Sequence, residues 1–319
     1  MRLARLLQLL LLTLPLTACK GLHPSREIDL IPLFSTDMPS LCLHAGMDEA
    51  VDDAGLHVRF NGPPDGDTQR QIDIVAEAIA RNVYGIAITP PRLYSANGVV
   101  RQAASRGIPT VVLMHPALFP PQQHLSFVVE DLAVAAQLAA ARVQAVTPPH
   151  THILIAGIDT ISSGSQDRFT AVDSALKQTV PQDTVTVRIT NSSGNRAFVS
   201  ELVKALSEDS SINAIIALDS HAAYWIALTV HRANAGNRIK VIAFDQSVEV
   251  LAALRHGDVD SVIAQDLRTT GRLAISNMQR DRHQLPVPTI TRVAPLLVTR
   301  EDIDSDATQR VLLLNWMRP

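Results

Sequence analysis

The feature that most constrains the fold of this chain is a regular alternation of short apolar runs with helix-patterned segments. The apolar runs are bounded by polar or glycine-containing loops, which is typical of strands buried on both faces of a parallel sheet. The alternation predicts strands at residues 28–34, 57–61, 85–89, 110–114, 126–129, 152–157, 184–190, 213–218, 239–244 and 260–264, with an extended stretch near 289–298. It predicts helices at residues 39–54, 95–105, 131–145, 166–179, 195–208, 221–233, 247–256 and 268–281, and another that turns Ile72, Val75, Ala76 and Ile79 inward. The fold class is therefore α/β, with parallel sheets covered by helices on both faces.

The number of strand–helix units indicates two lobes, because so many units exceed one compact sheet. The chain has 319 residues, of which 46% are hydrophobic, enough for two sizeable cores. Its net charge is −3, so the sequence gives no indication of a basic surface that would bind nucleic acid. Of its two cysteines, Cys42 lies in an apolar helical pattern and is expected to be a buried small hydrophobe.

The N-terminal segment has the pattern of an export signal. Arg2 and Arg5 precede an almost unbroken leucine run at residues 6–14, which is shorter than a membrane span. The run ends in Leu-Thr-Ala-Cys at residues 16–19, which resembles the lipobox of bacterial lipoproteins. This resemblance implies a signal peptide at 1–18, lipid attachment at Cys19 and a tether at 19–26. We expect a protein of the periplasm or cell envelope that is held to a membrane only by its lipid; an ordinary secretory signal is the alternative.

Several local sequences identify a family when they are taken in order. They are QI at 71–72, VYGIAITP at 83–90, AASRGIPTVV at 103–112, DRF at 167–169, IIALDS at 215–220, VIAFD at 241–245, and IAQD at 263–266 followed by Gly271. In this order the chain resembles the type I periplasmic binding proteins, specifically the ribose-binding-like sugar group. Regulators similar to the lactose repressor share these lobes but carry a DNA-reading segment where this chain has an export signal.

The resemblance implies two Rossmann-like lobes joined by a three-crossing hinge. The crossings are expected near Val129–Glu130, Gln265–Asp266 and His283–Pro286. The first lobe then comprises residues 27–129 with 266–286, and the second comprises 130–265 with 287–319.

Candidate ligand-binding residues follow the predicted strands, because open α/β sheets bind ligands beyond the carboxyl ends of their strands. We select Asp37, His115, Arg168, Asp219, Asp245 and Gln265. Carboxylates accept hydrogen bonds from hydroxyls, amides both donate and accept, and arginine offers a planar fork, so the set suits a polyhydroxylated ligand. By the resemblance, Arg168, Asp219, Asp245 and Gln265 stand where sugar contacts are usually made.

Each candidate also has a purely structural interpretation. Arg168 could pair with Asp167 or Asp159 at the surface, and Asp245 could cap a helix, as aspartate often does. Asp219 replaces the asparagine usual in the family, and His115 stands where an arginine is often found. These departures leave the ligand's hydroxyl pattern and charge open.

The first loop departs most from the family, which often places sugar-stacking rings there. Ser40 and Leu41 follow Pro39, so no ring stands at this place, and Phe119 and Tyr94 are the nearest substitutes. The specific sugar is therefore not predicted.

The resemblance implies a solute-binding lipoprotein that delivers a sugar-like polar molecule to a membrane ABC permease. A sensing module that presents its closed form to a membrane receptor or kinase is the alternative, since both use the same lobes. We expect that the protein is not an enzyme. The only conceivable nucleophile–base pair is Ser35 or Ser192 with His115, and nothing in the spacing of these residues supports it. No cofactor, metal site or nucleic-acid partner is expected, and the protein is expected to be a monomer.

Overall fold

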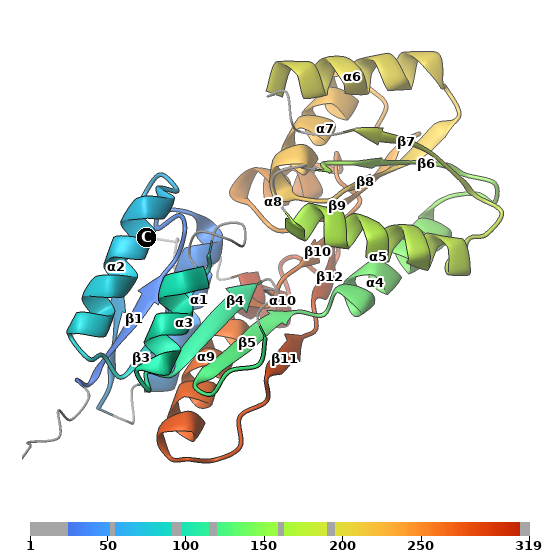
Figure 1. Ribbon diagram of the computed structural model, residues 1–319. Helices are drawn as coiled ribbons and strands as arrows, with labels where there is room; N and C mark the ends of the chain where they lie inside the picture. The colour runs from blue at the N-terminus through green and yellow to red at the C-terminus, as the bar shows by residue number, and fades with distance from the viewer. Residues whose placement is uncertain are drawn as a thin grey trace, which may run out of the picture.

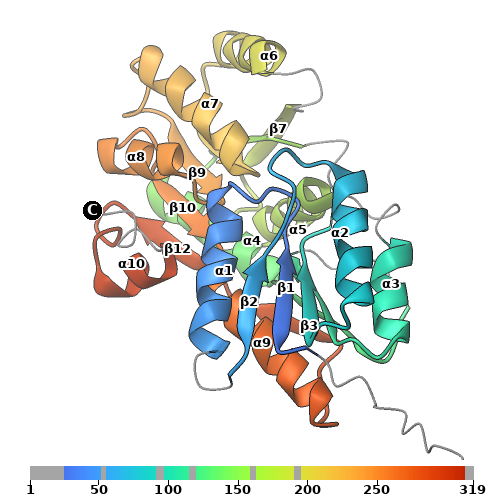
Figure 2. The same ribbon diagram turned by 90° about the vertical axis from the view of Figure 1, so that its left-hand side faces the viewer.

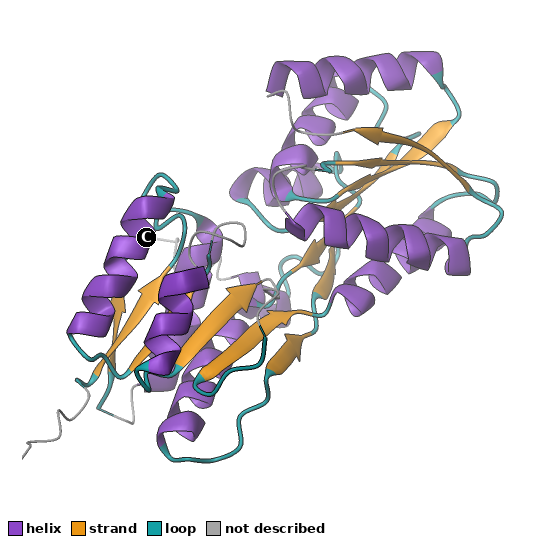
Figure 3. Cartoon of the chain, viewed as in Figure 1, coloured by secondary structure: helices purple, strands orange, loops and turns teal. Residues whose placement is uncertain are grey.

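The computed structural model describes residues 25–51, 55–90, 97–114, 120–158, 163–189 and 195–312. These residues form two lobes, each built on one six-stranded sheet with helices on both faces (Figure 1). Strands and helices alternate along most of the chain (Figure 3). The predicted α/β architecture with two lobes is confirmed. The segment expected to be a signal peptide, Cys19 and the start of the expected tether lie outside the described residues.

The first lobe contains a fully parallel sheet with strand order β11-β5-β4-β3-β1-β2. Its strands are β1 (Glu27–Ile31), β2 (His57–Phe60), β3 (Gly85–Ile88), β4 (Thr110–Met114), β5 (Leu125–Glu130) and β11 (Ile290–Val293). The helices α1 (Met38–Val51) and α9 (Leu267–Arg282) pack on one face, and α2 (Thr68–Ala80) and α3 (Asn97–Ser105) pack on the other. Figure 2 looks onto α1, with α9 beside it although the two helices are far apart in sequence.

The second lobe contains a sheet with strand order β12-β10-β9-β8-β6-β7. Its strands are β6 (His152–Ala156), β7 (Thr184–Ile189), β8 (Ile212–Ala217), β9 (Lys240–Phe244), β10 (Ser261–Ala264) and β12 (Leu296–Thr299). The helices α4 (Leu132–Val146) and α5 (Ser163–Thr179) cover one face; α6 (Asn195–Glu208), α7 (Ser220–Arg232) and α8 (Val248–His256) cover the other. The edge strand β12 runs antiparallel to β10, and α10 (Asp306–Leu312) follows it.

The chain passes between the lobes three times, and the third passage differs from the prediction. The first follows Glu130, and the second lies at Gln265–Asp266, between β10 and α9. We expected the third near His283–Pro286, but it lies at residues 294–295, between β11 and β12. The reason is that Ile290–Val293 pairs with β5, so this strand completes the first sheet before the chain crosses.

Two local predictions are also corrected. The strand expected at 28–34 ends at Ile31, which leaves Phe34 in the following loop. The helix α2 buries Gln71, Ile74, Val75 and Ala78, whereas Ala76 is exposed. Ile72 and Ile79 are partly buried against the same core, as predicted. The buried Gln71 amide donates to the carbonyl oxygens of Ile31 and Thr89, at 3.1 and 3.0 Å.

Two glycines bring α1 and α9 together in the first lobe. A Cβ at Gly46 would overlap the backbone of Arg268, and a Cβ at Gly271 would overlap the backbone of Leu43 and Met47. The close approach ties the first helix of the lobe to the segment that returns after the second crossing. Cys42 is buried in this region, 1% exposed, as predicted, and its thiol is free. Among the described helices, none has the length and apolar character needed to cross a membrane.

Candidate functional site

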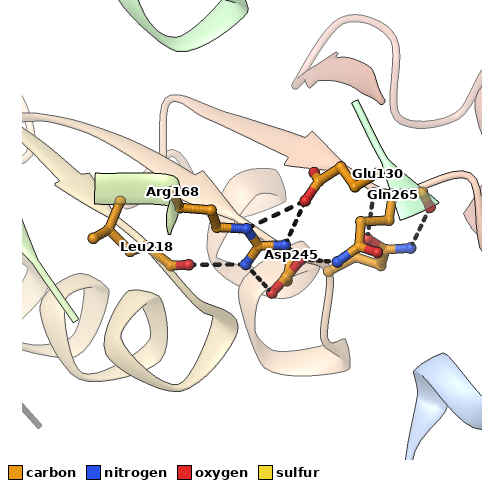
Figure 4. Close-up of polar contacts among 6 residues, drawn as sticks. Glu130, Arg168, Leu218, Asp245 and Gln265 are labelled. Atoms are coloured by element: carbon orange, nitrogen blue, oxygen red, sulfur yellow. Dashed lines mark hydrogen bonds and ion pairs between the residues drawn. The ribbon is translucent and has the colours of Figure 1, made fainter. Parts of the chain in front are cut away.

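The centre of the candidate site is Arg168, on the first half of α5. Its Nε and Nη2 donate to Glu130 Oε2 at 3.3 and 2.8 Å, and its Nη1 and Nη2 donate to Asp245 Oδ2 and Oδ1 at 2.6 and 2.8 Å (Figure 4). Nη1 also donates to the carbonyl oxygen of Leu218 at 2.9 Å. A guanidinium has five N–H groups, so each one of Arg168 has an acceptor within the protein.

This network is buried. The side chains of Arg168 and Glu130 are 4% and 3% exposed, and that of Asp245 is 23% exposed. Burial raises the pKa of the Glu130 carboxyl above its ordinary value; Arg168 opposes that rise, and the charge of Asp245 adds to it. Burial works against the charge of Arg168, but Asp245 and Glu130 hold its pKa above the ordinary value. Arg168 is therefore charged, and both Glu130 and Asp245 interact with its positive charge.

Asp245 connects Arg168 to the second crossing between the lobes. It follows β9 in a left-handed conformation with φ of 65°, and its Oδ1 accepts a hydrogen bond from Gln265 Nε2 at 2.6 Å. The Gln246 side chain pairs with the Gln265 backbone, donating to its carbonyl at 2.9 Å and accepting from its N–H at 3.1 Å. Glu130 and Gln265 stand at two different crossings, so the network spans both.

The two structural alternatives for these residues are therefore wrong. Arg168 is not a surface residue with surface partners, since it is buried between Glu130 and Asp245. Asp245 does not cap α8, because Ser247 is its N-cap and accepts from the Val250 N–H.

Asp219 lies beside this network on the second lobe. It is the N-cap of α7, where Oδ1 accepts from the Ala222 N–H at 2.7 Å. Burial raises the pKa of its carboxyl, and the charges of Asp245 and Arg168 also act on it. The structure thus brings Arg168, Asp219, Asp245 and Gln265 to one edge of the second sheet.

Of the other two candidates, Asp37 is not part of this cluster. Asp37 stands on the first lobe at the start of α1, and its Oδ1 accepts from the Ser40 N–H at 2.8 Å. The adjacent Met38 packs against core residues of both lobes, so this end of α1 reaches the second lobe. His115 lies outside the described residues.

Two residues of interest were missed in the sequence. Glu130 ends an apolar strand at the first crossing, and its acidic character at that place is the only signal in the sequence. Phe34 is a ring in the first loop, 44% exposed, so the expectation that this loop lacks a ring is wrong. Its ring lies over Gly66, where a Cβ would be 2.6 Å from two ring atoms and φ is +81°.

Comparison with known proteins agrees with this architecture. The model of a family described as "Periplasmic binding protein domain" matches residues 39–280. No curated protein sequence matches the chain significantly.

Solved structures also match over most of the chain. An arabinose-binding protein of Geobacillus stearothermophilus aligns with a TM-score of 0.81 at 19% identity, covering 88% of this chain and 99% of that one. An ABC transporter solute-binding protein of Agrobacterium vitis bound to α-D-tagatopyranose aligns with a TM-score of 0.78 at 20% identity, covering 89% and 98%. At these identities the match shows a shared fold. Because the family model spans most of the chain and the two-lobe topology agrees with it, the chain belongs to the periplasmic binding proteins of type I fold.

Proposed function

We propose that the protein is an extracytoplasmic solute-binding protein that captures a sugar-like polar molecule between its lobes and delivers it to an ABC permease. The observation that carries the proposal is the cluster of Asp219, Asp245 and Gln265 around Arg168 at one edge of the second sheet. Carboxylate and amide groups at the carboxyl ends of strands match the hydroxyls of a polyol. The solute-binding proteins with a similar fold that hold D-arabinose, tagatose and D-fucose support the same ligand class.

Capture rests on the two-lobe geometry. The three crossings are short, and Met38 on the first lobe already contacts the core of the second. A ligand that contacts both lobes only when they close binds the closed form more tightly than the open form. The difference between these two binding free energies shifts the population towards the closed form. The exposed ring of Phe34, on the first lobe, is our candidate for stacking on the ligand.

A thermal-shift screen of the purified protein against neutral sugars and polyols tests ligand capture. We expect at least one to raise Tm, because a ligand that binds only the folded state stabilises it. Asp245→Asn should reduce the shift strongly, whereas Asp304→Asn, at a side chain that is 69% exposed, should leave it unchanged. The proposal fails if no sugar or polyol raises Tm, or if both variants respond like the wild type.

Delivery to a permease is tested in cells. Once a ligand is known, deletion of the gene should abolish uptake of the labelled ligand. Normal uptake together with a lost response to the ligand would instead indicate the sensing alternative.

We also propose a lipid anchor at Cys19, on the sequence of residues 1–19 alone. Cells fed labelled palmitate should label the wild-type protein, and Cys19→Ala should lose both the label and the membrane fraction. Equal labelling of the two proteins would contradict the anchor.

A further inference from the structure

We propose that Glu130 determines the charge specificity of the site. By accepting hydrogen bonds from Arg168, Glu130 makes the cluster of Arg168, Asp219, Asp245 and Gln265 accept uncharged or amine-bearing polyols and reject polyols that carry a carboxylate or phosphate. The inference rests on the proposed function and adds a ligand class and the residue that sets it.

The first argument is the saturation of Arg168. A guanidinium with free N–H groups binds a carboxylate or phosphate through two parallel hydrogen bonds. Here Glu130 takes two of the donations and Asp245 takes two, while the Leu218 carbonyl takes the fifth. An anionic ligand group would have to displace one of these carboxylates from a buried pair to reach Arg168.

The second argument is the local charge. The carboxylates of Glu130, Asp245 and Asp219 interact with the single guanidinium of Arg168, and His221 is the other titratable group acting on Asp219. With all three carboxylates ionised the group is negative, and with both Glu130 and Asp219 protonated it is neutral. In neither state does this set of described residues attract an anion.

The third argument is a buried acceptor without a donor. Glu130 Oε2 holds Arg168, but Oε1 of the same carboxyl is buried and has no hydrogen-bond partner in the described part of the chain. An unsatisfied buried acceptor is unfavourable, so this atom favours a neighbour with an O–H or N–H group. Hydroxyls and ammonium groups can donate to it, whereas a carboxylate or phosphate oxygen would be repelled.

The test measures charge selectivity directly. By calorimetry we would titrate the protein with D-galactose, D-galacturonate and D-galactosamine. We would then repeat the titrations with D-glucose and D-arabinose and with the acid and amino derivative of each, where they exist. We expect the wild type to bind the neutral sugar or amino sugar at least about tenfold more tightly than the matching acid, the effect of about 1.4 kcal/mol of repulsion.

Glu130→Gln keeps the shape of the side chain but removes its charge, so Arg168 keeps only one carboxylate partner. We expect this variant to reduce the preference for the neutral or amino sugar over the matching acid by about tenfold, mainly through tighter binding of the acid. Glu208→Gln makes the same chemical change at a surface side chain that is 65% exposed and should keep the wild-type ratio.

The possible outcomes separate the two proposals. Tight binding of the uronate by the wild type, or the same ratio in Glu130→Gln, overturns the role of Glu130 and leaves sugar capture standing. If Glu130→Gln does not fold, tight binding of the uronate by the wild type still overturns the proposal. If no member of these series binds and no sugar or polyol raises Tm in the thermal-shift screen, the proposed function falls, and this inference falls with it.

Discussion

Replacing Arg168 by methionine should destabilise the protein strongly, because it leaves two carboxylates without their cation. Methionine retains much of the apolar stem of arginine but makes none of its hydrogen bonds. Arg168 and Glu130 are 4% and 3% exposed, so their charges are almost entirely removed from water. Removing one partner of such a buried pair typically costs about 3–5 kcal/mol. That is a large fraction of the stability of a typical domain, roughly 5–15 kcal/mol.

The loss should depend on pH in a defined direction. Without Arg168, burial acts on Glu130 with no cation to oppose it, and the pKa of Glu130 in the folded state stays above its value in the unfolded chain. The folded state then binds a proton more readily than the unfolded state, so stability falls as pH rises above the ordinary carboxyl range. The deficit should be larger at pH 7.5 than at pH 5.

Denaturation in urea, followed by circular dichroism at both pH values, measures the effect. Arg255→Met is the matched control, since Arg255 pairs with Asp304 at the surface and is 40% exposed. Such a pair is worth about 0–1 kcal/mol. Adding Glu130→Gln to Arg168→Met should restore part of the stability, because it removes a buried charge. Equal losses in the two arginine variants, or a larger deficit at pH 5, would show that the buried carboxylates do not depend on the charge of Arg168.

Three further predictions concern packing, capping and reactivity. Gly271→Val should lower the Tm by many degrees, because its Cβ would overlap the backbone of α1, whereas Gly98→Ala in α3 has open space around it and should be neutral or stabilising by up to about 1 kcal/mol. Asp219→Asn keeps the cap of α7 and should change stability little, while Asp219→Ala should lose about 1 kcal/mol in the same denaturation assay. Equal losses would show that the cap is not important. Burial raises the pKa of Cys42 to about 12, so iodoacetamide at pH 8 should label it only after unfolding; fast labelling of the native protein would contradict its burial.

The family of the chain and the edge of its second sheet could be predicted because both depend on local patterns. Parallel strands end at a common edge, so the polar residues that follow them gather there whatever the details of packing. This rule brought Arg168, Asp245 and Gln265 together, and hydrogen bonds join them in the structure. Whether they hold a ligand remains a prediction.

The partner of each polar group could not be predicted in the same way. Glu130 and Arg168 are 38 positions apart and belong to different secondary-structure elements. No periodicity in either segment encodes their meeting, and surface partners for Arg168 were equally compatible with the sequence. The same holds for Phe34, whose exposure depends on where β1 ends and on the approach of the loop that contains Gly66.

The α/β alternation, the two lobes and the burial of Cys42 could all be predicted from the sequence, because periodicity and apolar content are properties of short segments. The strands on either side of residues 294–295 are both short extended segments, so their sequences do not show which sheet each one joins. Their pairing with β5 and β10 in the folded protein assigns them to different sheets. The tertiary structure also decided that Arg168 faces two carboxylates. Contacts between distant segments bring these charged groups together and exclude water from them. Both effects determine which charges the site holds and how they are paired.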